Sequence, residues 1–257
     1  MARVLVTGSA DGLGQMAARL MVIAGHQVIL HARSPERARQ AMSAVPGAES
    51  AITGDLSSIQ DTREVAKQAN ASGPFDAVIH NAGIGYREPK RGKTADGLPP
   101  VFAVNSLAPY ILTALIRKPH RLIYVSSGLH RSVEPGLDDL TWTRRTWSGS
   151  VAYSESKLHN VILAFAIARR WSDVLSNALE PGWVATKMGG RGAPDSLEDA
   201  PKTQVWLATS DAPEAQVSGL YYYHMKTRPA NAAASDEATQ DSLLVEYARI
   251  SGVTLPG

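Results

Sequence analysis

Apolar residues near the start of the chain alternate between two spacings. The run from Arg3 to Thr7 is short, aliphatic and β-branched and ends at a glycine, which predicts a strand. From Leu13 the apolar positions fall three or four residues apart as far as Met21, which predicts a helix that ends at Gly25. Residues 27–32 (QVILHA) then form a continuous apolar run, typical of a parallel strand that is covered on both faces.

The same alternation continues to the end of the chain. Ser58 is a candidate N-cap for a helix that runs to about Asn70, because Asp61 follows three residues later. Further elements are predicted as a strand around Ile52, strands at 75–80, 121–126, 176–179 and 219–224, and helices at 100–116, 153–170, 199–209 and 237–250. Strands that alternate with helices of this length predict βαβ units and a doubly wound parallel sheet with helices on both faces.

Length and composition predict one α/β domain over residues 1–257. The chain has 257 residues, about the size that single α/β domains commonly reach, and no repeat or interdomain linker divides it. Its hydrophobic fraction of 44% against 19% charged residues is sufficient to bury a large core. Glycine- and proline-rich pieces occur as loops at 89–100, 134–149 and 189–194.

Charge and residue usage exclude several classes of protein. The 26 Lys and Arg nearly balance the 24 Asp and Glu, so no basic field for nucleic acid is expected. The absence of cysteine excludes disulfides and thiolate metal sites, and the seven histidines lack a metal-ligand spacing, so no metal site is expected. The longest apolar run, Val161 to Ala168, is shorter than the ~18 residues of a membrane span. We expect a soluble, cytoplasmic protein without a secretory signal.

A glycine-rich turn follows the first predicted strand. Residues 7–14 (TGSADGLG) have the spacing Gly-x-x-x-Gly-x-Gly and lead into the first predicted helix. Backbone N–H groups and the positive end of the helix dipole face an approaching anion there, and a Cβ would obstruct a pyrophosphate. Glycines in such turns are also purely structural in some proteins, but the position within a βαβ unit favours a dinucleotide site.

Six further motifs stand at βα positions along the chain. They are Asp55-Leu56, Asn81-Ala82-Gly83, Asn105, Ser127, Tyr153-x-x-x-Lys157, and Pro181-Gly182 with Thr186. Together with the glycine turn they resemble the short-chain dehydrogenase/reductase family, and the resemblance spans nearly the whole chain. A narrower resemblance to its retinol-dehydrogenase-like branch rests on Thr94-Ala95-Asp96-Gly97, on Ser-Ser-x-x-His at 126–130 and on a tail with Gly-x-Tyr-Tyr at 219–222.

This resemblance implies a Rossmann-like single domain that transfers a hydride between a nicotinamide and a small-molecule carbonyl or alcohol. It implies as catalytic residues Asn105, Ser127, Tyr153 and Lys157. It implies as cofactor-binding residues Gly8, Ser9, Asp11, Gly12, Leu13, Gly14, Arg33, Asp55, Leu56, Asn81, Ala82, Gly83, Tyr153, Lys157, Pro181, Gly182, Val184 and Thr186.

The catalytic motif suits proton transfer to or from a substrate oxygen. Tyr153 can serve if its pKa, ordinarily ~10, is lowered towards neutrality. Lys157 lies one helical turn later, so its ammonium is expected near the phenol, where it would favour the ionised form. Ser127 ends a strand and can donate a hydrogen bond to the substrate oxygen, while the family implies that Asn105 holds a water. The alternative for Tyr153 and Lys157 is an exposed helix face.

The end of the second strand predicts a preference for NADP(H), with NAD(H) still accepted. Members of the family that prefer NAD carry an acidic residue there, which binds the ribose hydroxyls. This chain has Ala32 followed by Arg33, whose guanidinium can pair with a 2′-phosphate. Two points weigh against this prediction. Asp11 stands where many NADP-preferring relatives carry a basic residue, and Arg33 can equally be an exposed loop charge.

Two segments are predicted to lie on the substrate side, a loop at about 128–152 and a C-terminal segment at 183–257. The loop is about twice the length common in the family and is expected to close over the substrate as a lid. Its Trp142 and Trp147 either cover an apolar substrate or anchor the loop, and the sequence favours neither interpretation over the other. The nearby cluster Arg87, Lys90, Arg91 and Lys93 either attracts an anionic substrate or is a solvated loop.

Quaternary structure and two rival functions stay open. The stretch from Asn105 to Arg121 is short for the helix that commonly builds the family's dimer face, so a homodimer, a homotetramer and a monomer are all compatible. One rival function is a catalytically silent dinucleotide-sensing or scaffold protein, against which the intact motif set argues. The other is a nucleotide-sugar epimerase or dehydratase, disfavoured because only about 70 residues follow Gly182.

Overall fold

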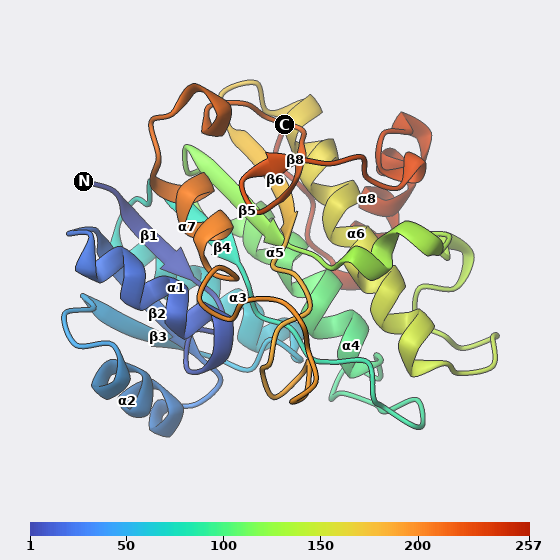
Figure 1. Cartoon of the computed structure of the whole chain (residues 1–257). Helices are drawn as coiled ribbons and strands as arrows, with labels where there is room; N and C mark the ends of the chain where they lie inside the picture. The colour runs from blue at the N-terminus through green and yellow to red at the C-terminus, as the bar shows by residue number, and fades with distance from the viewer.

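The computed structural model describes residues 1–257 and is built around one eight-stranded sheet (Figure 1). Its strands are β1 (Arg3–Val6), β2 (Gln27–Ala32), β3 (Ser50–Thr53), β4 (Ala77–His80), β5 (Arg121–Val125), β6 (Leu175–Glu180), β7 (Tyr221–Tyr223) and β8 (Lys226–Thr227). Their order is β3-β2-β1-β4-β5-β6-β7-β8, and every neighbouring pair is parallel except β7 and β8. The predicted α/β fold with a doubly wound parallel sheet is confirmed.

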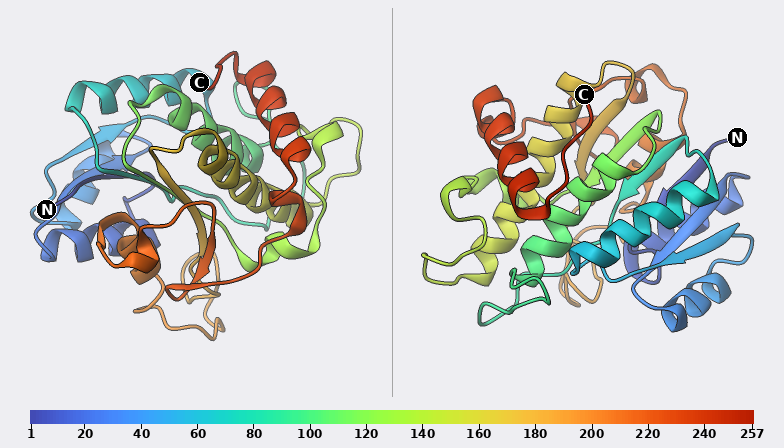
Figure 2. Two further views of the ribbon diagram at one scale, coloured as in Figure 1. Left: turned by 90° about the horizontal axis from the view of Figure 1, so that it is seen from above. Right: turned by 180° about the vertical axis from the view of Figure 1, so that it is seen from behind.

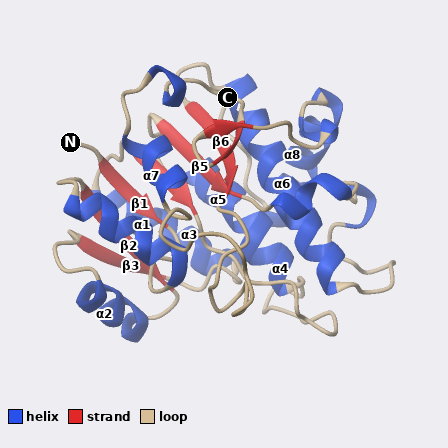
Figure 3. Ribbon diagram, in the orientation of Figure 1, coloured by secondary structure: helices blue, strands red, loops and turns tan.

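Helices cover both faces of this sheet (Figures 2 and 3). One face carries α1 (Gly12–Ile23), α2 (Pro35–Ala44) and α7 (Lys202–Thr209). The other carries α3 (Ile59–Ser72), α4 (Pro100–Phe102), α5 (Ala108–Leu115) and α6 (Gly149–Arg170), with α8 (Glu237–Ser251) packed outside α6. Each face therefore has its own apolar core, and the larger one includes α6, from which Tyr153 and Lys157 project.

Local capping explains where several helices begin. Ser58 accepts a hydrogen bond from the Asp61 backbone N–H at 3.2 Å, as the sequence pattern predicts. The α2 helix was not predicted, although Ser34 caps it and Pro35 occupies its first turn. The α6 helix begins at Gly149, four residues before the predicted start, because Ser148 caps it through the Val151 N–H.

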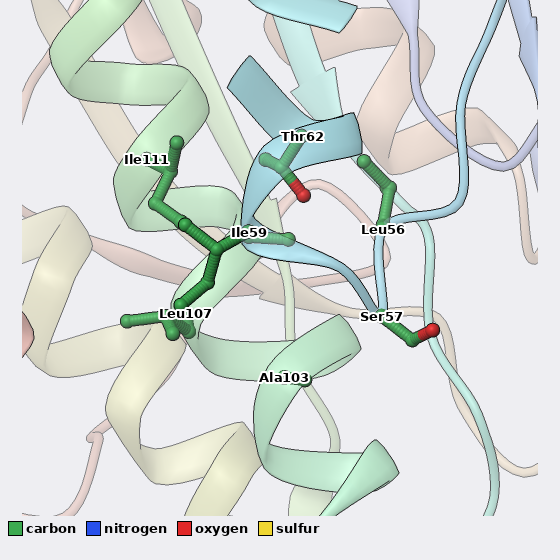
Figure 4. Close-up of a pocket in the computed structure, with 8 residues that line it drawn as sticks. Leu56, Ser57, Ile59, Thr62, Ala103, Leu107 and Ile111 are labelled. Carbon is green, nitrogen blue, oxygen red and sulfur yellow. The ribbon is translucent and has the colours of Figure 1, made fainter. Parts of the chain in front are cut away.

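The predicted helix at 100–116 is interrupted by one π-helical turn. That turn, η1 (Ala103–Leu107), joins α4 to α5 and contains Asn105. It packs on the start of α3, where Ile59, Leu107 and Ile111 line a small apolar pocket (Figure 4). Wider turns of this kind are frequent at functional sites, and this one presents Asn105 beside the carboxyl end of β4.

The C-terminal helix covers the face of α5 and α6. Tyr247 of α8 is fully buried with its ring centroid 5.0 Å from that of Tyr110. Its hydroxyl donates to Ser106 Oγ at 3.1 Å, and Ser106 in turn donates to Nδ1 of His159 at 2.8 Å. The imidazole Nε2–H then donates to the Pro135 carbonyl at 2.6 Å. One hydrogen-bonded chain thus joins α8, the π-helical turn and α6.

Among the helices, none is both long and apolar enough to cross a membrane. The longest, α6, has 22 residues but carries Glu155 and Lys157 in its first half and Arg169 and Arg170 at its C-terminal end.

We expect Tyr247→Ala to lower the free energy of unfolding by about 3–5 kcal/mol, since it empties a fully buried aromatic site. Tyr247→Phe should cost about 1 kcal/mol, because only the hydrogen bond to Ser106 is lost. Urea unfolding measures both. Val245→Ala, at a position 65% exposed on the same helix, is the control and should change the value by less than about 0.5 kcal/mol. Equal effects at the two positions would show that α8 is not docked as described.

Candidate active site

The glycine turn between β1 and α1 is pressed against the end of β4. A Cβ on Gly8 would lie 2.7 Å from Ala82 Cα, and one on Gly14 would lie 2.3 Å from Asn81 Nδ2. Asn81 donates from that same nitrogen to the carbonyls of Thr7 at 3.0 Å and Gly8 at 3.2 Å. These two glycines are therefore required for packing between chain segments.

Gly12 has a different environment. Its backbone is left-handed, with φ of 57°, and a Cβ built on it meets no atom within 4 Å. It lines a cavity of about 870 Å³, at the N-terminus of α1 where unpaired N–H groups favour an anion. This open space at a helix N-terminus could accommodate the pyrophosphate of a dinucleotide. The residues around Gly12 are therefore compatible with the predicted cofactor.

The cavity collects most of the predicted site residues. Those that line it are Gly8, Asp11, Gly12, Leu13, Arg33, Asp55, Leu56, Asn81, Ala82, Gly83, Tyr153, Lys157, Pro181 and Thr186. Those outside the lining are Ser9, Gly14, Asn105, Ser127, Gly182 and Val184. Among these, Ser9 is buried and donates to the Val6 carbonyl at 2.9 Å. Val184 is buried where its segment pairs with Asp195.

Asp11 is paired with two cations that sequence reasoning missed. Its Oδ2 accepts from Arg37 of α2 at 2.8 Å and from Lys187 of the loop after β6 at 3.0 Å. The hydrogen bond from Lys187 is the largest cause that lowers the pKa of Asp11, against a smaller opposing effect of burial. Both cations line the cavity, so the acidic group at its mouth is neutralised within the chain.

Tyr153 and Lys157 project from α6 into the same cavity, and Tyr153 is buried. Lys157 Nζ lies 5.7 Å from the centre of the Tyr153 ring and donates to the Val125 carbonyl at 2.9 Å. Burial raises the pKa of Tyr153 to about 12, although a hydrogen bond with Ser127 opposes the change. Burial lowers the pKa of Lys157 to about 8. The expected lowering of the phenol's pKa is therefore not found in this structure, because burial outweighs the other effects.

Asn105 is held rigidly and fully buried beside these two residues. Its Oδ1 accepts from the Ile84 N–H at 2.8 Å, and its Nδ2 donates to the Ile84 carbonyl at 3.0 Å and to Ser156 Oγ at 3.1 Å. A Cβ on Gly83 would be 3.3 Å from Lys157 Nζ and 3.4 Å from Asn105 Oδ1. The Asn105 amide thus fixes the segment after β4 against α6. This structural role is additional to the water-holding role that the family resemblance implies.

Comparison with known proteins agrees with this arrangement. A family model described as short chain dehydrogenase matches residues 2–128. An uncharacterized oxidoreductase of Emericella nidulans is 43% identical over all of both chains. Human retinol dehydrogenase 13 is 30% identical over 98% of this chain and 85% of its own length. A crystal structure of an uncharacterized protein from Mycobacterium paratuberculosis shares the fold with a TM-score of 0.85 and 24% identity, covering 100% and 96% of the two chains.

The chain belongs to the short-chain dehydrogenase/reductase family. As expected, its relatives include retinol dehydrogenases. These relatives support an oxidoreductase of the dehydrogenase/reductase class, a family that uses NAD(P)H and acts on small molecules. The family model ends at residue 128, where the long segment before Tyr153 begins.

Of the two segments predicted on the substrate side of this dehydrogenase, residues 183–257 contribute to the lining of the cavity and residues 128–152 do not. From residues 183–257, Ala185, Lys187, Met188 and Leu197 line the cavity together with Thr186, whereas α7 and α8 build the two cores. Met188 Sδ lies 3.7 Å from the Tyr153 hydroxyl, which donates towards it. Residues 128–152 do not line the cavity, and Trp142 is buried with Val101, Ala152 and Tyr153. The contacts of Trp142 favour an anchoring role over direct cover of a substrate.

Two arginines of the basic cluster at 87–93 have different environments. Arg91 donates to the carbonyls of Thr141 at 2.9 Å and Gly97 at 3.1 Å, so it ties the two loops together. Arg87 is exposed, and its guanidinium lies over the ring of Tyr86.

His31, at the end of β2, is a further residue of the site that sequence reasoning did not assign. Its Nδ1 accepts from the Gly8 N–H at 3.0 Å, and its Nε2–H donates to the Gly54 carbonyl at 3.0 Å. The ring is buried, and burial is the main reason that its pKa is lowered to about 4. The neutral imidazole therefore connects the glycine turn to the end of β3.

We expect stability to fall as the pH is lowered from about 7 to about 4.5. The pKa of His31 is about 4 in the folded chain, against an ordinary value of 6.5, so the unfolded chain binds the extra proton over this interval. Burial also lowers the pKa of His80 to about 3 and of His159 to about 4. Urea unfolding of His31→Gln should show a shallower pH dependence than the wild type. The exposed His120→Gln should keep the wild-type slope, and an unchanged slope in His31→Gln would contradict the assignment.

Proposed function

We propose that this protein is an NADP(H)-preferring oxidoreductase that interconverts a carbonyl and an alcohol, with Tyr153 as the general acid and base. One observation carries the proposal. The cavity that begins at the open Gly12 turn also contains Tyr153 and Lys157, so a dinucleotide held at the turn can extend to the phenol. The residues that would hold it are the cavity-lining members of the predicted set, joined by Arg37 and Lys187.

The nicotinamide supplies or accepts the hydride when the cofactor is bound. Tyr153 supplies the proton to the substrate oxygen during reduction and removes it during oxidation. Ser127 contributes a hydrogen bond at the same point, because its side chain lies close enough to the Tyr153 hydroxyl to lower the pKa of the phenol. Lys157 places its ammonium near the Tyr153 ring, and Asn105 fixes the segment after β4 beside it.

The protonation state of Tyr153 bears on both directions of the reaction. With its pKa at about 12, Tyr153 is a neutral phenol near pH 7 and carries the proton that reduction of a carbonyl requires, but it is a weaker acid than an exposed tyrosine. The neighbours Ile84, Tyr86 and Met188 lie around it, and of these three only Tyr86 carries an ionisable group. A carbonyl substrate with an apolar body suits this environment.

The charges around the end of β2 support the preference for NADP(H). Arg33 is exposed, lines the cavity and has no carboxylate partner within 4 Å, so its guanidinium is free for a 2′-phosphate. Asp11, which appeared to oppose this preference, is offset by Arg37 and Lys187. Ala32 leaves no carboxylate where an NAD-preferring member would have one.

A monomer is the quaternary structure that the fold favours. The face of α5 and α6 is already covered by α8 and by the tail, in which the carbonyls of Val253 and Pro256 accept hydrogen bonds from Tyr110 and Trp171. A second copy could use that face only if α8 and the tail were displaced. Light scattering at several protein concentrations tests it directly.

Tyr153→Phe should abolish turnover while cofactor binding is kept, because only the hydroxyl that transfers the proton is removed. Cofactor oxidation across a panel of ketones and aldehydes measures the turnover, and titration of protein fluorescence measures the dissociation constant. Tyr223→Phe, in β7 and outside the cavity, is the matched control and should behave as the wild type. Retention of more than about a tenth of the wild-type kcat would refute the role of Tyr153. A wild type that binds cofactor but reduces nothing would favour the silent alternative.

NADPH should bind about ten- to a hundredfold more tightly than NADH, since a charge-assisted phosphate contact contributes about 1.5–3 kcal/mol. The double variant Ala32→Asp with Arg33→Asp should erase or reverse this ratio. Arg39→Asp, which is exposed on α2 and does not line the cavity, controls for a general change of charge. Equal affinities of the wild type for the two cofactors would overturn the assignment.

A further inference from the structure

The segment between Ser127 and α6 is tightly folded around one buried carboxylate. Asp139 is only 5% exposed, and its carboxylate accepts backbone N–H groups of Thr143 and Arg144 at 2.9 Å and of Arg145 at 3.0 Å. Burial opposes its ionisation, yet these hydrogen bonds together lower the pKa of Asp139 to about 2. The turn at 139–145 is therefore a fixed unit.

This unit is locked to α6 by an ion pair two residues after Tyr153. Arg145 Nη1 and Nη2 donate to the two carboxylate oxygens of Glu155 at 2.6 and 2.9 Å. Glu155 is 4% exposed, so its charge depends on this partner. Gly136, with φ of 59°, packs on the pair, and a Cβ there would lie 2.9 Å from Glu155 Oε1.

The same guanidinium holds Trp142. The Arg145 Cζ atom is 3.9 Å from the centre of the Trp142 ring, a stacked geometry that a lysine cannot reproduce. Trp142 has a left-handed backbone with φ of 54° and is 6% exposed. Such a conformation is costly for a bulky residue and needs surrounding contacts to persist.

Trp142 lies against the apolar surroundings of the phenol. It is clustered with Tyr153, and its ring centre is 5.3 Å from that of Trp147. Trp147 is in turn fixed by its Nε1–H, which donates to the Glu88 carbonyl at 2.9 Å. Tyr86, two residues before Glu88, meets the Tyr153 ring edge-on at 5.5 Å between centres. A shift of Trp142 would therefore move the partly exposed aromatic rings beside Tyr153.

We propose that Glu155 and Arg145 are positioning residues that hold Trp142 behind Tyr153 and so fix the shape of the substrate pocket. This inference rests on the proposed function, because a substrate pocket requires Tyr153 to act on a carbonyl. It makes residues 137–148 a fixed support that packs behind the residues lining the cavity, in place of the mobile lid expected from the length of the segment.

The kinetic test uses Glu155→Gln and Arg145→Lys, with cyclohexanone as a small ketone and acetonaphthone as a bulky one. We expect the KM for acetonaphthone to rise about tenfold or more in both variants, since the aromatic rings lose their fixed position. The kcat, the KM for cyclohexanone and the dissociation constant of NADPH should stay within about twofold. Glu155→Asp, which keeps the carboxylate, should restore part of the loss. Arg144→Lys is the control, because that neighbouring side chain is exposed and donates only to the Asp138 carbonyl.

A second measurement does not depend on turnover. Acrylamide quenching of tryptophan fluorescence, with Trp142→Phe as the reference, reports how accessible Trp142 is. Glu155→Gln should increase its accessibility several-fold, whereas Arg144→Lys should not. Unchanged quenching, or a parallel loss of kcat, both KM values and NADPH affinity, would overturn the positioning role. If Glu155→Gln increases the quenching but the wild type reduces neither ketone, the result supports the inference that the ion pair positions Trp142. Only the proposed function would then be refuted.

Discussion

The close contact between the β1–α1 turn and the end of β4 is the constraint on which the site depends. Gly14 can approach Asn81, and Gly8 can approach Ala82, only because neither glycine has a Cβ. The contact brings together two strands that are neighbours in the sheet although 70 residues separate them in sequence. At such a switch point the following helices leave on opposite faces, so a cleft opens over the strand ends. The contact therefore holds the glycine turn and the segment after β4 together as two neighbouring parts of the cavity lining.

Features that are local in sequence could be predicted, and features that need tertiary contacts could not. The bounds of β2 match the predicted 27–32, since a continuous apolar run with polar flanks is a local signal. The α2 helix was missed because its buried residues are only Ala38 and Ala41, which give a weak apolar period. Its real signal is the cap Ser34 followed by Pro35. The π-helical turn around Asn105 has no sequence signature of its own and follows from packing against Ile84 and Ser156.

The same division holds within the site. The glycine turn and the spacing of Tyr153 and Lys157 predicted residues that do line one cavity. No local pattern indicates that Arg37 and Lys187, 150 residues apart, converge on Asp11. Residues 128–152 were predicted to form a lid from their length, and this prediction did not use Glu155, which lies within the Tyr153-x-x-x-Lys157 motif and is buried. Glutamate is seldom fully buried unless it is paired, so it required a partner such as Arg145.

Burial of Tyr153 has two consequences that act in opposite directions. It raises the pKa of the phenol to about 12, so the group keeps its proton near pH 7 although it is a weaker acid than an exposed tyrosine. It also makes the phenolate costly, so oxidation of an alcohol would need added positive charge close to the ring. Lys157 is the nearest cation, but burial lowers its pKa to about 8 and the Val125 carbonyl binds its ammonium. With only its own charges, the chain therefore keeps Tyr153 as a neutral phenol, and the ease with which the phenol releases its proton depends on how firmly Lys157 stays protonated.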